Sequence, residues 1–116
     1  MAKANKAIIE EFLDIIVRIV SEGSSYQYIL MVLSKFVQSH IEEFPFAAHI
    51  HIDLHGIKVG EEINSADPQL AGKFLKVMIN TLFSDLFMHL VSRKLPKGLI
   101  EDLEYLGVEI KDSKKV

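Results

Sequence analysis

Between residues 48 and 63 the chain reads AHIHIDLHGIKVGEEI, and this stretch decides the fold. Apolar and polar residues alternate on both sides of His55-Gly56, a pattern typical of two strands joined by a tight turn. Pairing across that turn leaves Ile50 opposite Glu61 as a mismatch, while three apolar pairs agree: Leu54 with Ile57, Ile52 with Val59, and Ala48 with Ile63. We therefore predict an antiparallel β-hairpin with one apolar and one polar face.

Helical periodicity precedes this hairpin in two segments. Residues 5–20 and 26–42 repeat apolar positions every three or four residues, as amphipathic helices do. Gly23 suits the end of the first helix, and Ser24 or Ser25 can cap the second by accepting from its free amides. The two segments predict an antiparallel helical hairpin.

A third helix is expected after the β-hairpin. Asp67 as N-cap and Pro68 at the first helical position begin an apolar segment that runs to Lys94. If unbroken, this helix is about 40 Å long at about 1.5 Å per residue, whereas a compact domain of this length is about 35 Å across. A rod of that length with two apolar faces predicts packing against a second subunit.

The rest of the chain completes the expected domain. Residues 99–105 predict a short helix, residues 108–110 a possible C-terminal edge strand, and residues 111–116 a disordered basic tail. We expect residues 1–110 to form a single α+β domain, built from the helical hairpin, the central antiparallel β-hairpin, the long helix, the short helix and the edge strand.

Composition narrows the class of protein. The chain has 116 residues with 49% hydrophobic and 25% charged side chains, as expected for one packed core. Its net charge is −3 and its 13 basic residues are scattered, which argues against nucleic-acid binding. There is no cysteine, and charges interrupt the apolar N-terminal stretch, so we expect a cytoplasmic protein that does not insert into a membrane.

The polar face of the hairpin carries the densest group of potential metal ligands. His49, His51 and Asp53 lie at alternate positions, about 6.6 Å apart along a strand, so that two of them can reach one ion. Glu62 lies across the ladder and could complete the site, with His55 as a further candidate. This run predicts zinc or another divalent ion as the ligand.

The same run is similar to the His-x-His-x-Asp-His metal motif of the metallo-β-lactamase superfamily. It departs from that motif by the extra Leu54, and that fold needs a far longer chain, so we reject the family assignment. The simpler interpretation is an ordinary polar face, on which Asp53 pairs with Lys58 and His49 with Glu62. No cofactor is then expected.

No nucleophile elbow or phosphate-binding glycine loop occurs in the chain, which favours a non-catalytic role. The order of elements is similar to the opening of GAF-type sensor domains and roadblock-like dimerisation domains, and this likeness implies a regulatory module. We expect a homodimeric regulatory or protein-interaction module that binds a protein partner or encloses a small apolar ligand. The alternative is a small metal-binding protein or metal-dependent enzyme that uses His49, His51 and Asp53.

Overall fold

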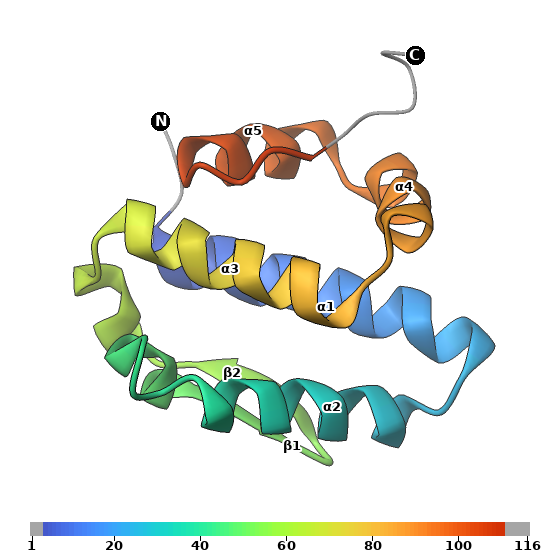
Figure 1. Cartoon of the computed structure of the whole chain (residues 1–116), viewed down its shortest axis with the longest axis horizontal. Coiled ribbons are helices and arrows are strands. Elements are labelled where there is room, and N and C mark those ends of the chain that lie inside the picture. Colours follow the sequence, from blue (N-terminus) through green and yellow to red (C-terminus); the bar gives the residue numbers. More distant parts are fainter. Residues whose placement is uncertain (1–3, 111–116) are drawn as a thin grey trace. The chain divides into compact units, whose positions relative to one another are not determined.

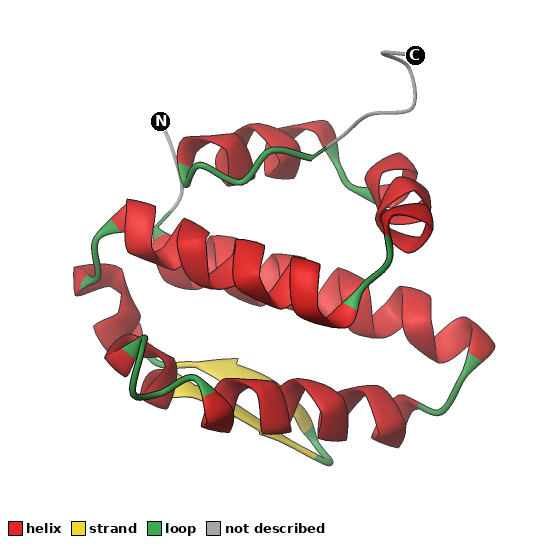
Figure 2. Ribbon diagram, in the orientation of Figure 1, coloured by secondary structure: helices red, strands yellow, loops and turns green. Residues whose placement is uncertain are grey.

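The structure is a computed structural model that describes residues 4–110, and the predicted tail at 111–116 lies outside the described residues. Those residues form five α-helices, two short 3₁₀ helices and a two-stranded antiparallel sheet (Figures 1 and 2), which confirms the α+β class. The contacts divide the described chain into two compact units, residues 4–66 and residues 67–110. The single domain expected over residues 1–110 stays a prediction.

The first unit begins with the expected helical hairpin. Helix α1 spans Asn5–Gly23 and α2 spans Tyr26–Ser39, three residues shorter than the sequence predicted. The Ser25 hydroxyl accepts from the Tyr28 N–H at 3.2 Å, which satisfies one free amide at the start of α2. The apolar stripes are buried, and the fully enclosed side chains of α1 and α2 are Ile8, Ile9, Phe12, Leu13, Ile16 and Leu33.

The β-hairpin follows, but it is shorter than the alternation suggested. Strand β1 spans Ile50–Asp53 and β2 spans Gly56–Val59, and two 3₁₀ helices, η1 (Pro45–His49) and η2 (Glu61–Ser65), flank the pair. The turn consists of residues 54 and 55, not 55 and 56 as predicted. The Asp53 carboxylate accepts the backbone N–H of residue 55 at 2.8 Å, a local bond that closes the turn.

This turn shifts the register by two residues from the predicted one. Ile50 now pairs with Val59 and Ile52 with Ile57, so the mismatch of Ile50 with Glu61 disappears. A shift of two residues leaves the side chains of β1 and β2 on their predicted faces, because side chains alternate with a period of two, whereas residues 48–49 and 61–63 lie in the 3₁₀ helices and not on the sheet. The faces were therefore predicted correctly although the partners were wrong.

Each strand packs against one helix of the α1–α2 hairpin: β2 contacts α1, and β1 contacts α2. The Asn5 side-chain amide, itself buried, donates to the carbonyls of Ile63 at 3.2 Å and Ala66 at 2.9 Å. This amide ties the start of α1 to the segment that leaves the sheet. The first unit is thus a two-layer arrangement of a ribbon on a helix pair.

The second unit contains three helices: α3 (Pro68–Leu82), α4 (Asp85–Lys94) and α5 (Lys97–Tyr105). The long helix expected from Pro68 to Lys94 is broken, because Phe83 is extended and the Ser84 hydroxyl caps α4 by accepting from the Phe87 N–H at 3.1 Å. Residues 68–94 therefore form no single rod of about 40 Å, so helix length gives no reason to expect packing against a second subunit. Residues 108–110, predicted as an edge strand, carry no regular secondary structure.

A close backbone contact joins α3 to the end of α5 within this unit. An ideal Cβ built on Gly72 would lie 1.7 Å from the Leu106 carbonyl oxygen, so glycine alone fits there without movement.

Leucines on α4 remain at the surface, and the Leu86 side chain is 75% exposed. None of the helices within residues 4–110 is both long and apolar enough to cross a membrane.

Candidate functional site

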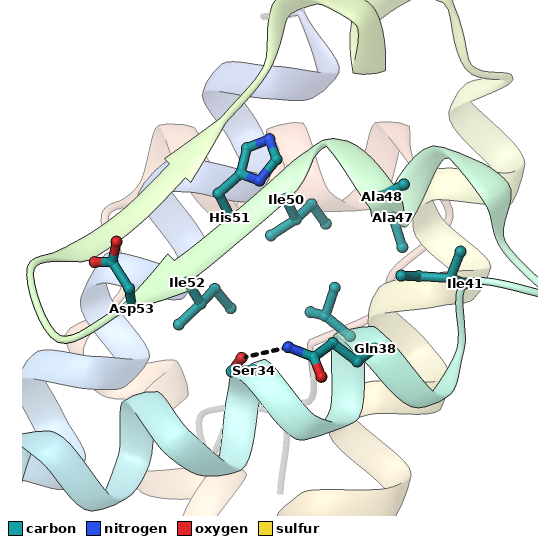
Figure 3. A pocket seen from close by; sticks show the side chains of 10 residues that line it. Ser34, Gln38, Ile41, Ala47, Ala48, Ile50, His51, Ile52 and Asp53 are labelled. Carbon is teal, nitrogen blue, oxygen red and sulfur yellow. Dashed lines mark hydrogen bonds between the residues drawn. The ribbon is translucent and has the colours of Figure 1, made fainter.

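A groove of about 330 Å³ lies between α2 and β1 in the first unit (Figure 3). One wall is a single face of α2, formed by Ser34, Val37 and Gln38 at helical spacing, with Ile41 just beyond the end of the helix. Residues 47–48 and 50–53 form the other wall. The lining mixes apolar side chains with polar groups, and on α2 the Gln38 amide donates to the Ser34 hydroxyl at 3.2 Å.

The groove continues along β1 toward the turn. A second hollow of about 390 Å³ shares Ser34, Gln38, Ile52 and Asp53 with the first and extends it to Leu30, Met31, Lys35 and Leu54. At this end the Met31 side chain is 49% exposed and the Leu54 side chain 65%. Large apolar side chains at a concave, partly apolar surface are typical of a docking site.

The outer edge of β1 runs along this groove and is open. The Gly60 N–H donates to the His49 carbonyl at 2.8 Å, so bonded pairs of the ladder recur at alternate positions from there. By this alternation the N–H and C=O of Ile52 point away from β2, and within residues 4–110 no further strand pairs with β1. An unpaired edge beside an apolar groove is the geometry used to bind an added strand.

At the outer edge of β2, by contrast, a carboxylate binds one outward backbone group. The Val59 N–H, which also points away from the ladder, donates to the Glu10 carboxylate of α1 at 3.1 Å. The Lys6 ammonium lies 4.0 Å from the same carboxylate oxygen. Burial raises the pKa of the neighbouring Asp14 carboxyl, Glu10 raises it further, and Arg18 opposes the rise.

The predicted metal ligands are spread over three elements. His49 ends η1, and its Nδ1 lies 3.7 Å from the Glu62 carboxylate of η2, so this predicted pair does meet. His51 lies on β1 opposite Lys58. The Asp53 carboxylate accepts the N–H of His55 in the turn, and therefore Asp53 is not paired with Lys58 across the ladder as predicted.

Within the described part of the chain, no three His, Asp or Glu side chains gather closely enough to hold a metal ion. Metal binding by His49, His51, Asp53 and Glu62 therefore stays a prediction, with the His49–Glu62 pair as its structural support. Sequence reasoning missed the groove, because its α2 wall consists of ordinary amphipathic-helix positions. The one available signal was Leu54, an apolar residue at a turn.

Comparison with known proteins adds no assignment to this geometry: no family model matches the chain, and neither a curated protein nor a solved structure is similar enough to count as a match.

Proposed function

We propose that this chain is a non-catalytic protein-interaction module that acts as a homodimer through the groove between α2 and β1. The observation that carries the proposal is the open edge of β1 beside an apolar groove. A two-stranded ribbon is marginally stable by itself and presents unpaired N–H and C=O groups, so adding a strand satisfies both deficits. A regulatory role and a cytoplasmic location belong to the same proposal, since a chain without cysteine needs no oxidising compartment.

Sedimentation velocity at micromolar concentration tests the homodimer directly. Leu54→Glu places a charge on a side chain that is 65% exposed, so the fold should survive while the dimer dissociates. Leu86→Glu is the matched control, because it changes a leucine of the second unit that is at least as exposed, at 75%. A wild-type protein that sediments as a monomer at all concentrations would refute the homodimer.

Metal binding is the second candidate function, favoured by the approach of His49 to Glu62. It predicts stoichiometric zinc in freshly purified protein and a melting temperature that rises on zinc addition. His49→Ala should abolish both effects, and a metal-free protein whose melting temperature is unchanged by zinc would eliminate this candidate.

A further inference from the structure

We propose that the groove is filled by β1 of a second copy, paired antiparallel about a two-fold axis at Ile52. This inference rests on the proposed homodimer and names its register. The two ribbons would then form one four-stranded sheet in the order β2, β1, β1, β2. Antiparallel pairing of identical edges is self-complementary, as a two-fold interface requires.

The backbone of Ile52 suits the axis position. Its N–H and C=O both point to the open edge, so two copies of Ile52 can exchange two hydrogen bonds across the axis. The Ile50 N–H is already used by the Ala47 carbonyl at the end of η1. On the open edge, Ile52 is therefore the β1 residue that has both an N–H and a C=O available for a second strand.

The side chains favour an axis at Ile52 over an axis at the adjacent His51. An axis at Ile52 places His51 opposite Asp53 of the second copy, twice over, so that an imidazole N–H can donate to a carboxylate across the strands. An axis at His51 would instead place two imidazoles opposite each other. An axis between two residues is excluded, because it would set apolar side chains of one copy against the polar face of the other.

On the apolar face, the same register sets Ile50 opposite Leu54 of the second copy. Leu54, which is 65% exposed in one chain, would then be covered. The side chain of Ile52 borders both hollows of the groove, so its counterpart in the second copy enters at their junction. The register thus accounts for the exposed leucine, for the groove, and for the complementary His51 and Asp53 side chains.

An engineered disulfide tests the axis, since the natural chain contains no cysteine. In Ile52→Cys the two sulfur-bearing residues would have Cα atoms about 5.5 Å apart, within reach of a disulfide. We expect mild oxidation to convert most of this variant to a cross-linked dimer on a non-reducing gel. Ile57→Cys is the matched control, because Ile57 pairs with Ile52 but belongs to β2, and it should stay uncross-linked.

A charge variant tests the register separately from folding. His51→Glu faces Lys58 within its own ribbon, so the hairpin should be kept or strengthened, but it also faces Asp53 of the second copy, which weakens the dimer. We expect the dimer dissociation constant to rise at least about tenfold. Adding Asp53→Asn keeps an oxygen for the turn while removing the repulsion, and should recover most of the affinity.

The outcomes separate the two proposals. A dimeric wild type whose Ile52→Cys variant resists cross-linking, or whose affinity His51→Glu leaves unchanged, overturns this register and leaves the homodimer standing. A monomeric wild type overturns both. Cross-linking through Ile57→Cys as readily as through Ile52→Cys also overturns the register, because the pairing would then not be specific to β1.

Discussion

The two edges of the hairpin are treated differently by the helices beneath them. At β2, α1 supplies the Glu10 carboxylate, which accepts the outward Val59 N–H. At β1, α2 supplies Gln38 and Ser34, and these side chains bond to each other instead of to the strand. The side chains of the neighbouring helix therefore decide which outward backbone groups of an edge are satisfied, and natural proteins normally protect such edges.

The largest expected effect on stability comes from a control substitution in the second unit, away from both edges of the β-hairpin. Gly72→Ala forces a Cβ against the Leu106 carbonyl and should lower the free energy of unfolding by about 3 kcal/mol, as overpacking does. Chemical denaturation measures this loss. The dimer dissociation constant, taken by sedimentation where the variant is folded, should not change; a parallel weakening would show that the second unit takes part in the interface.

Proline substitutions compare the two sides of β1. His51→Pro removes an N–H that bonds to β2 and should cost about 2 kcal/mol of unfolding free energy, whereas Ile52→Pro removes an N–H at the open edge and should cost less. Denaturation curves of the two variants measure the difference. The dimer should be lost in Ile52→Pro although its fold is retained. Equal destabilisation by both prolines would contradict the assignment of the open edge.

Removing the Glu10 carboxylate should leave the outer edge of β2 with an unsatisfied N–H, as at the outer edge of β1. Glu10→Ala leaves the Val59 N–H without its acceptor and should cost about 1 kcal/mol, while Glu10→Gln keeps an acceptor oxygen and should cost less. Hydrogen exchange at the Val59 amide reports the same change. If Val59 exchanges equally slowly in Glu10→Ala, another group closes this edge.

The smallest expected effect concerns the acidic neighbour of that carboxylate. Because burial and Glu10 raise the pKa of Asp14 in the folded chain, its protonated form is favoured there, and stability falls as pH rises above the ordinary Asp value. Asp14→Asn should therefore flatten this part of the pH profile and raise stability at neutral pH by less than about 0.5 kcal/mol, because the side chain is exposed and screened. Urea titrations across the acid range measure it; a profile unchanged by the substitution would rule out this contribution.

Much of the fold could be predicted from the sequence, because the spacing of apolar residues identifies the main elements. Alternation around Ile50 and Ile52 identified the ribbon and its faces, and helical spacing identified α1 and α2. The break at Ser84 was missed, although a serine followed by Asp85 is a usual helix start, because the apolar period continues through it. The groove could not be predicted, since its walls come from separate elements whose approach depends on tertiary packing.

The sequence by itself determined which residues are apolar on each face of each element, because that information is periodic and local. Only the tertiary structure decided the register, the bond from the Val59 N–H to Glu10 and the groove between β1 and α2. These features depend on which side chains of distant segments can reach a given backbone group. Distances of that kind are set by packing, and residue spacing along the chain does not encode them directly.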